Sequence, residues 1–384
     1  MSDKNTFLSY WERETYFSHI DVAVIGSGIV GLNAAWVLKK KNPNLKILVL
    51  ESGIIPHGAS TRNAGFACIG SVSEILDDLK THTEDETLQI IEKRWKGLQR
   101  LRKNLGDANI GYEESGGYEL FTDKDTLLFN QCEEKISHLN QLLSPIIDSY
   151  NTYKIADHKN ETFGFHQISQ IIKNRAEGLI DTGMMMQTLL KKTQLENVCI
   201  VNGIEVESFH ETNNDVEIIT NKGFGFKTKK LLIATNGFAK KLIPEIDVNP
   251  ARAQVLVTSP IAGLKLKGGF HYDKGFYYFR NIGQRILLGG GRNMDFIGEE
   301  TTEMNITEAI QNRLEQMLRE IIIPQNEFKI EMRWSGIMGM GGKKKPIIKK
   351  LSKNMYCAVR MGGMGVAIGS LVGEEAAELI LQDL

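Results

Sequence analysis

The sequence has few cysteines, no long apolar run and no excess of either charge. Its four cysteines show neither a C-x-x-C motif nor the spacing of metal ligands, so we predict no metal site. No apolar run approaches the roughly 18 residues that a membrane-spanning helix needs. The first residues also lack the apolar core of a signal peptide. We therefore expect a cytoplasmic protein without a membrane span.

The charge balance and the length narrow the class of protein further. Lys and Arg number 46 and Asp and Glu 47, which gives a net charge of −1. Because phosphate contacts need concentrated Lys and Arg, we predict no nucleic-acid partner. The densest basic stretch, Lys343 to Lys345, is typical of a solvated loop. A chain of 384 residues suits two domains rather than one core.

A segment near the N-terminus has the pattern of a dinucleotide-binding βαβ unit. An apolar strand at 20–25 leads into Gly26-Ser27-Gly28-Ile29-Val30-Gly31, a G-x-G-x-x-G turn, and then into an apolar helix. A second strand at 47–50 ends in Glu51, 20 residues after Gly31. Strand, turn, helix, second strand and terminal acid all agree, which makes this pattern more specific than a lone glycine-rich turn.

Each part of this unit has a mechanical role. Gly26 permits the tight turn, Gly28 lets a pyrophosphate approach the backbone, and Gly31 lets the helix pack close to the strand. The pyrophosphate then lies at the helix N-terminus, where unpaired N–H groups and the helix dipole favour an anion. Glu51 is expected to accept hydrogen bonds from the ribose hydroxyls, and a carboxylate there argues against a 2′-phosphate.

The rest of the chain alternates between Rossmann-like and β-rich segments. Helical periodicity covers 72–105 and 125–143, and a helix with several strands covers 178–237. Residues 251–332 are mainly β with one helix, and a strand and a glycine-rich helix start occupy 355–384. This order predicts a dinucleotide domain that is interrupted by a substrate domain.

With these segments in place, the chain resembles the FAD-dependent D-amino acid oxidase superfamily, which holds glycine oxidase, sarcosine oxidase and γ-glutamylputrescine oxidase. The resemblance covers nearly the whole chain. Besides the βαβ unit, it rests on Gly58-Ala59-Ser60-Thr61-Arg62-Asn63-Ala64-Gly65, Ala234-Thr235-Asn236-Gly237 and Gly362-Gly363-Met364-Gly365-Val366. It implies an α/β fold with two interleaved domains: a Rossmann-like FAD-binding domain of the glutathione-reductase type at 19–105, 160–250 and 333–384, and an α+β substrate domain on an antiparallel sheet at 106–159 and 251–332.

The resemblance also implies noncovalent FAD and the residues that hold it. The loop after Glu51 would wrap the pyrophosphate and the flavin, with Phe66 and Ala67 beside the isoalloxazine, and Val206 would contact the adenine through its backbone. A helix beginning near Val366 would direct its positive end at the flavin and stabilise the reduced, anionic form. The predicted cofactor-binding set is Gly26, Gly28, Ile29, Val30, Gly31, Glu51, Ser52, Ser60, Thr61, Asn63, Ala64, Gly65, Phe66, Ala67, Val206, Thr235, Asn236, Gly237, Gly362, Gly363, Met364, Gly365 and Val366.

One departure from the superfamily concerns the substrate. Met338 stands where members that oxidise amino acids usually place an arginine, whose planar guanidinium binds the substrate carboxylate. Either the substrate lacks an α-carboxylate, or another cation binds it. Arg280, Arg360 and Lys343 to Lys345 are the candidates.

Two further departures concern the flavin. Ile337 or Met338 replaces the cysteine that attaches flavin covalently in sarcosine oxidase-like members, with Cys68 as the alternative attachment. Leu287 stands where some oxidases carry a lysine that activates O2. The sequence therefore leaves two alternatives for the electron acceptor, O2 or another compound.

The segment Phe276-Tyr277-Tyr278-Phe279-Arg280 is the predicted substrate face. Strand alternation places Phe276, Tyr278 and Arg280 on one side and the other two aromatics opposite. Tyr278 would orient a polar group of the substrate and Arg280 would pair with an anion, so these two and Met338 are the predicted catalytic residues. The alternative is that the aromatics form a sheet core. His271 could act as a base, although a lone histidine in a glycine-rich turn is typical of a surface.

These features predict an FAD-dependent amine or amino acid oxidoreductase. A hydride would leave the C–H bond next to nitrogen of a small substrate and give an imine. Two alternatives keep the fold: a flavin domain that acts on a modified base of transfer RNA, and a flavin-binding module without catalysis.

Overall fold

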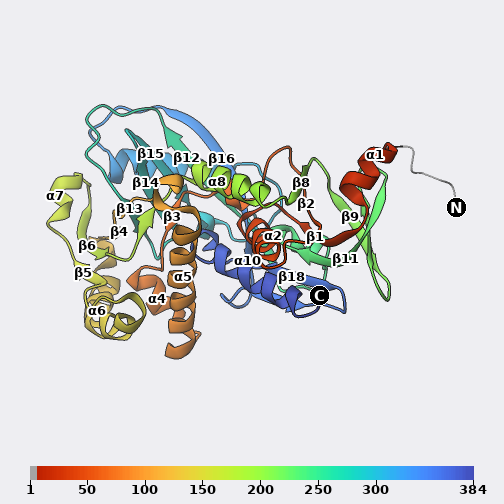
Figure 1. The fold of residues 1–384 in the computed structure, drawn as a ribbon. Coiled ribbons are helices and arrows are strands. Elements are labelled where there is room, and N and C mark those ends of the chain that lie inside the picture. The colour runs from red at the N-terminus through yellow and green to blue at the C-terminus, as the bar shows by residue number, and fades with distance from the viewer. Residues whose placement is uncertain (1–6) are drawn as a thin grey trace.

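The computed structural model describes residues 7–384, which form two eight-stranded sheets and one two-stranded sheet. The two large sheets lie toward opposite ends of an elongated molecule (Figure 1). The first sheet is parallel from β18 to β8; one edge strand and a two-strand branch from β11 pair antiparallel. Its parallel strands are β18 (Met355–Val359), β11 (Gly225–Ile233), β1 (Ile20–Ile25), β2 (Ile47–Glu51) and β8 (Cys199–Asn202); β17 (Ile347–Lys350), β9 (Val206–Glu211) and β10 (Val216–Thr220) pair antiparallel.

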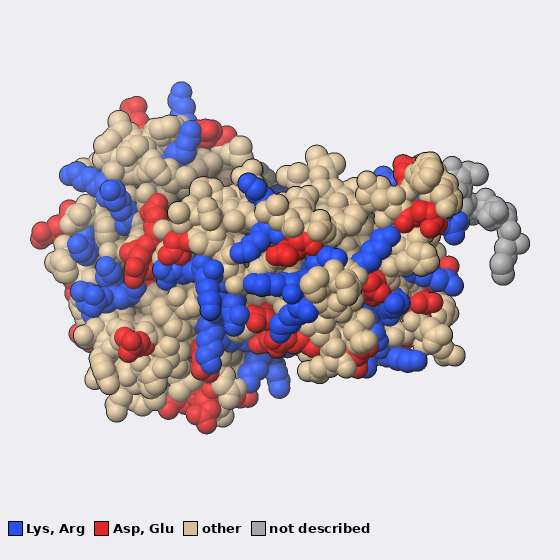
Figure 2. Space-filling model, in the orientation of Figure 1, with Lys and Arg blue, Asp and Glu red and all other residues tan. Residues whose placement is uncertain are grey.

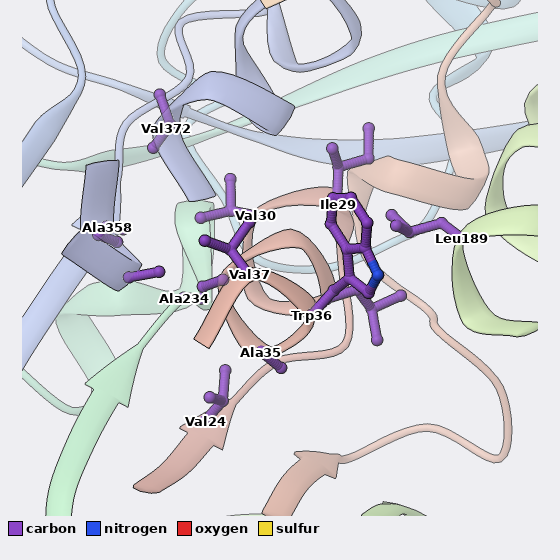
Figure 3. Close-up of a cluster of buried hydrophobic side chains, with 14 of the residues drawn as sticks. Val24, Ile29, Val30, Ala35, Trp36, Val37, Leu189, Ala234, Ala358 and Val372 are labelled. Carbon is purple, nitrogen blue, oxygen red and sulfur yellow. The ribbon is translucent and has the colours of Figure 1, made fainter. Parts of the chain in front are cut away.

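Helices cover one face of the first sheet: α2 and α10 are buried over most of their length, whereas α5 and α8 each bury one apolar face. Figure 3 shows this core, where Val30 and Trp36 of one helix lie with Leu189, Ala358 and Val372 from other elements. Helix α10 lies between α2 and α5 and packs against both (Figure 1). The helices of this layer are α2 (Ile29–Lys41), α5 (Glu84–Leu105), α8 (Thr182–Leu195) and α10 (Gly365–Leu381).

The second sheet is antiparallel except where β13 and β4 pair parallel. One of its faces is a core of apolar side chains that packs against α9 (Glu308–Met317), with Phe270, Phe279 and Leu288 side by side across three strands. In spatial order its strands are β16 (Ile330–Met340), β12 (Asn249–Thr258), β15 (Arg285–Gly290), β14 (Tyr277–Ile282), β13 (Gly269–Tyr272), β4 (Gly117–Thr122), β6 (Ile168–Asn174) and β5 (Tyr153–Ile155).

The remaining elements connect or cover the two sheets. They are α1 (Tyr10–Glu12) with a π-helical turn (Arg13–Phe17), α3 (Ala59–Arg62), α4 (Val72–Asp78), α6 (Thr126–Ile147), α7 (Lys159–Phe163), short turns at Asp107–Ile110, Asp123–Asp125, Asn236–Lys241, Arg292–Met294 and Leu318–Ile322, and the two-stranded sheet of β3 (Phe66–Ala67) and β7 (Gly178–Leu179).

The predicted α/β fold with a parallel and an antiparallel sheet is confirmed. The helical periodicity predicted over 72–105 corresponds to two helices, α4 and α5, because Thr83 caps α5 in a capping box with Glu86. Strands β6 and β16 both pair within the second sheet, although 160–250 and 333–384 were assigned to the FAD-binding domain. The domain limits themselves stay a prediction.

Over residues 7–384, no helix is both long and apolar enough to cross a membrane. In the same part of the chain, no group of three or more His, Cys, Asp or Glu side chains is arranged to hold a metal ion. Figure 2 shows acidic and basic side chains interspersed over the visible face.

Candidate functional site

The glycine-rich turn joins β1 to α2 with the tight geometry that its motif predicts. Gly26 has φ +105°, and a Cβ there would lie 2.9 Å from the Ala234 carbonyl oxygen. A Cβ at Gly31 would lie 2.0 Å from the Gly26 carbonyl oxygen, so only glycine lets α2 pack this close. Gly28 is the N-cap of α2 and gives no side-chain cap. The helix therefore begins with backbone N–H groups that suit an anion.

Glu51 ends β2 directly beside this turn. Its Oε2 accepts hydrogen bonds from the Ser27 N–H at 3.1 Å and the Ser27 hydroxyl at 2.7 Å. Its Oε1 accepts from the Gly53 N–H at 3.0 Å. A carboxylate has about four acceptor positions, so capacity remains for a ribose hydroxyl. Glu51 thus both fastens the turn and fits its predicted role.

The segment predicted near the adenine lies next to Glu51. The Ile204 N–H donates to the Glu51 carbonyl oxygen at 2.9 Å, and the Gly203 N–H donates to the Gly53 carbonyl oxygen at 2.9 Å. Val206 starts β9 two residues later, with its side chain in the core on the opposite face of the sheet from α2. A backbone contact of Val206 with adenine stays a prediction.

The loop after Glu51 folds back onto the N-terminus of α2. Ser60 Oγ accepts the Ile29 N–H at 2.9 Å. The Thr61 hydroxyl and the Asn63 amide donate to backbone carbonyls inside the loop. Asn63 Oδ1 also accepts the Gly65 N–H at 2.9 Å. Thr61 and Asn63 therefore use their side chains to shape the loop.

The end of this loop meets the second sheet. The Phe66 ring centroid lies 5.2 Å from that of His271 and 5.7 Å from that of Tyr278. Arg280 Nη1 donates to the carbonyl oxygens of Gly65 at 3.0 Å and Ile180 at 2.7 Å. The sheet face that carries His271, Tyr278 and Arg280, called the site face below, thus lies against the predicted flavin loop.

The segment before α10 approaches from a third direction. Gly362 and Gly363 have φ of +58° and +80°, which favours glycine at both positions. The Asn236 Oδ1 accepts the N–H groups of Arg360 and Met361, each at 3.1 Å, and so holds this turn in place. Helix α10 then begins without a side-chain cap. Its N-terminal N–H groups suit a negative group of a ligand.

Met338 and the turn after β11 complete this region. A Cβ at Gly363 would lie 3.4 Å from Met338 Sδ. A Cβ at Gly237 would lie 2.6 Å from the Met338 carbonyl oxygen. The Thr235 hydroxyl is buried and makes no hydrogen bond within residues 7–384. The glycine at 237 lets two protein segments pack closely, and the unsatisfied Thr235 hydroxyl fits a polar group of a bound cofactor.

The alternation predicted for 276–280 is confirmed for four of these five residues. Tyr277 and Phe279 lie in the apolar core, whereas Tyr278 and Arg280 lie on the site face. Burial raises the pKa of Tyr278 to about 12, so its phenol is a neutral hydrogen-bond donor at pH 7. The placement of Phe276 is wrong: it precedes the strand and packs against the core with Tyr277 and Phe279.

Arg280 and Arg360, two of the cations proposed for a substrate carboxylate, are engaged elsewhere. Arg280 donates to backbone carbonyls of the flavin loop, and burial lowers its pKa. Arg360 pairs with Asp247 and donates to the Lys345 carbonyl oxygen at 2.9 Å. Both arginines therefore hold protein segments together.

Lys344 and Lys345 line a cavity of about 220 Å³ that Gly362 and Met364 also border, whereas Lys343 is exposed outside it. Lys344 Nζ lies 2.5 Å from the Asp78 carboxylate, and Lys345 Nζ donates to Gln89 at 3.0 Å. Lys344 is therefore paired with a carboxylate, Lys345 is bonded to a neutral amide, and both lie beside the predicted flavin segment.

Of the positions predicted to differ from the superfamily, Met338 is partly buried and the others are close-packed. Ile337 and Leu287 are buried. Cys68 Sγ lies 3.6 Å from Met364 Sδ, and burial raises the pKa of the Cys68 thiol well above its usual range. A thiol held protonated is a poor nucleophile, which disfavours covalent attachment of flavin at Cys68.

The interpretation of His271 as a surface residue is wrong. Its Nε2 lies 3.0 Å from Glu177 Oε2 in a buried pair, and a Cβ at Gly117 would lie 1.7 Å from that oxygen. Burial opposes the imidazolium, but Glu177, Glu74 and Glu119 outweigh burial and raise the pKa of His271. No local signal reveals this pair, because Glu177 is 94 residues away.

A family model matches residues 21–379, described as DAO, FAD dependent oxidoreductase. The probable oxidoreductase OrdL of Haemophilus influenzae is 25% identical over 96% of this chain and 84% of its own length. The gamma-glutamylputrescine oxidoreductase of Escherichia coli is 23% identical over 94% and 84%. The solved glycine oxidase of Bacillus cereus superposes with a TM-score of 0.74 at 19% identity, covering 95% of this chain and 98% of that one. The chain belongs to the DAO family of FAD-dependent oxidoreductases.

Proposed function

We propose that this protein oxidises a C–N bond of a small amine or amino acid to an imine, with noncovalently bound FAD. The observation that carries the proposal is the contact of Phe66, from the flavin loop, with Tyr278 of the site face. It brings the predicted cofactor region and the predicted substrate face together. Bound FAD would supply the hydride acceptor, and the imine would hydrolyse in water.

The proposed cofactor contacts follow from the geometry of each segment. The N-terminus of α2 would hold the pyrophosphate, with Gly28 permitting close approach. Glu51 would hold the ribose through its remaining acceptor capacity. The uncapped start of α10 and the unsatisfied Thr235 hydroxyl would bind the remaining polar groups of FAD. With Ile337 and Met338 at the covalent-attachment position, the flavin is proposed to be noncovalent.

The chain's own residues would position the substrate rather than activate it by a strong base. Tyr278 would donate a hydrogen bond to a polar group of the substrate, and Phe66 would keep water away with its apolar ring. An amine that binds neutral needs no strong base for this oxidation. Arg280, which holds the flavin loop through carbonyl contacts, is proposed as a positioning residue.

The names of two relatives support the substrate class. The gamma-glutamylputrescine oxidoreductase of Escherichia coli is named for an amine, and the glycine oxidase of Bacillus cereus for an amino acid. Leu287, where some oxidases of the superfamily carry a lysine, leaves both O2 and another acceptor as electron-acceptor candidates.

An anaerobic screen tests the proposal. Holoprotein is mixed with a panel of amines and amino acids, and flavin absorbance is followed. Bleaching by at least one compound, with the imine-derived carbonyl as product, is expected. A flavin that no compound reduces contradicts the proposal and favours a flavin-binding module without catalysis. A salt-dependent gel shift with transfer RNA would instead support the modified-base alternative.

A further inference from the structure

A buried ion pair joins the site face to the strand that supports the flavin loop. His271 lies in β13, and its Nε2 is 3.0 Å from Glu177 Oε2, with 11% and 2% of the two side chains exposed. Glu177 directly precedes β7, which pairs antiparallel with β3 so that Leu179 lies opposite Phe66. The pair therefore fastens the two-stranded sheet, and with it Phe66, to the second sheet.

Two glycines make room for this arrangement on the site face. Gly117 of β4 and Gly269 of β13 are direct neighbours in the parallel register. A Cβ at Gly117 would lie 1.7 Å from Glu177 Oε2, and a Cβ at Gly269 would lie 2.9 Å from the Phe66 ring. The Glu177 carboxylate and the Phe66 ring thus occupy the space that two side chains would fill. His271, two residues after Gly269, contacts both.

Phe66 also contacts the residue that we propose to orient the substrate. Tyr278 lies directly opposite His271 in the antiparallel register of β13 and β14. The Phe66 ring is tilted by 59° to the His271 ring and by 76° to the Tyr278 ring, with the centroids 5.2 and 5.7 Å away. The ion pair and the proposed substrate face therefore hold the same aromatic ring.

The charges around the pair leave Glu177 as the main counterion of His271. Arg94 Nη2 lies 3.2 Å from Glu74 Oε1 and offsets that acid, and burial raises the pKa of Glu119, which favours its neutral form. Glu177 Oε1 makes no hydrogen bond within residues 7–384, so the imidazole supplies the donor that its carboxylate has there. The other titratable groups nearby have a raised pKa or are paired: Cys68, Tyr112, Tyr153, Tyr278 and Lys344 with Asp78.

We propose that His271 and Glu177 are positioning residues, which hold Phe66 beside the flavin and thereby set the rate of flavin reduction. The inference rests on the proposed function, in which the flavin loop and the site face meet at Phe66. While the imidazole is charged, the pair is a charge-assisted hydrogen bond. Once His271 loses its proton, Glu177 becomes a buried carboxylate without a counterion. This is costly and favours movement of Glu177 and of the attached β7.

The pair makes the position of Phe66 depend on pH. Burial opposes the imidazolium, but Glu177, Glu74 and Glu119 outweigh burial and raise the pKa of His271 above 6.5. The contribution of the pair is therefore complete below about pH 6.5 and is lost as pH rises through the raised pKa. The Kd of FAD should be higher at pH 9 than at pH 6 in wild type and should change little in Glu177→Gln. An unchanged Kd in wild type would contradict the inference without any substituted protein.

A double-mutant cycle at pH 6 tests whether the pair acts through Phe66. Fluorescence quenching of FAD by apoprotein gives the Kd for wild type, Glu177→Gln, Phe66→Leu and the double variant. Glu177→Gln should raise the Kd by about 3- to 10-fold, the usual worth of an aromatic contact, and should have no further effect in the Phe66→Leu background. Equal effects of Glu177→Gln in both backgrounds would overturn the inference.

Glu299→Gln is the matched control, because Glu299 forms a comparably buried ion pair on the α9 side of the second sheet. Glu299 Oε1 accepts from Arg252 at 2.6 Å and from Gln254 at 2.9 Å, and Gln254 Oε1 accepts from Gln311 of α9 at 3.2 Å. This substitution should lower Tm and leave both the Kd of FAD and its pH dependence unchanged. An equal rise of the Kd in Glu299→Gln would show that loss of any buried pair weakens FAD binding, and would refute a specific role of His271 and Glu177.

Anaerobic flavin reduction by a compound found in the screen separates this inference from the proposed function. At saturating substrate, Glu177→Gln should lower the limiting rate by about 10- to 100-fold, the usual cost of a misplaced group near the reacting atoms, and Phe66→Leu should again remove the effect. An unchanged rate in Glu177→Gln overturns the inference and leaves the oxidoreductase proposal standing. If no compound bleaches the flavin, the proposed function falls, and the FAD-binding cycle decides whether the pair holds Phe66.

Discussion

Replacing Glu51 with alanine separates its two roles in FAD binding and in folding. The substitution removes the acceptor for the buried Ser27 N–H and hydroxyl and for the Gly53 N–H. An unsatisfied buried donor costs about 1 to 3 kcal/mol, and two backbone N–H groups lose their acceptor, so we expect a loss of about 2 to 6 kcal/mol in the free energy of unfolding of the apoprotein.

The same substitution should also weaken FAD binding itself. Loss of the acceptor for the ribose hydroxyls should cost about 1 to 3 kcal/mol, which corresponds to a rise of about 5- to 150-fold in Kd. Fluorescence quenching of FAD by apoprotein measures the Kd, and urea unfolding of the apoprotein measures stability. Glu378→Ala is the control, because Glu378 is exposed and its 2.7 Å pair with Lys41 lies on the surface. A destabilised apoprotein with unchanged FAD affinity would refute the ribose contact.

Three further outcomes follow from the same geometry. Acid precipitation should release intact FAD, and flavin that stays in the pellet would instead indicate covalent attachment. Gly31→Ala should yield protein with little bound FAD, because its Cβ would lie 2.0 Å from the Gly26 carbonyl oxygen; normal flavin content would contradict the packing. Glu177→Gln should remove the stability from the pair with His271, whose raised pKa makes that contribution complete below about pH 6.5 and lost as pH rises through the folded pKa. Equal losses of stability at pH 6 and pH 9 would disprove this.

The parts of the fold that depend on neighbouring residues could be predicted from the sequence. The role of Gly31 follows from its place in the motif, and the alternation of Tyr278 with Phe279 follows from strand geometry. Thr83 and Glu86 form a capping signal for the start of α5. The break between the two helices within 72–105 could therefore also be predicted from neighbouring residues.

Contacts between residues that are far apart in the sequence could not be predicted from it. The pair of His271 with Glu177 joins residues 94 positions apart. Arg360 looked free in the sequence, and only the folded chain brings Asp247 to it.

The most direct test of the proposed chemistry is a primary isotope effect on anaerobic flavin reduction. A substrate identified in the screen is compared with the same compound deuterated at the carbon bonded to nitrogen. Oxidation of the C–N bond through loss of hydride predicts that deuterium slows the bleaching of the flavin severalfold in single-turnover measurements, because breaking this C–H bond reduces the flavin. Bleaching at the same rate for both compounds, at saturating concentration, would contradict hydride loss from that carbon as the rate-limiting step of flavin reduction.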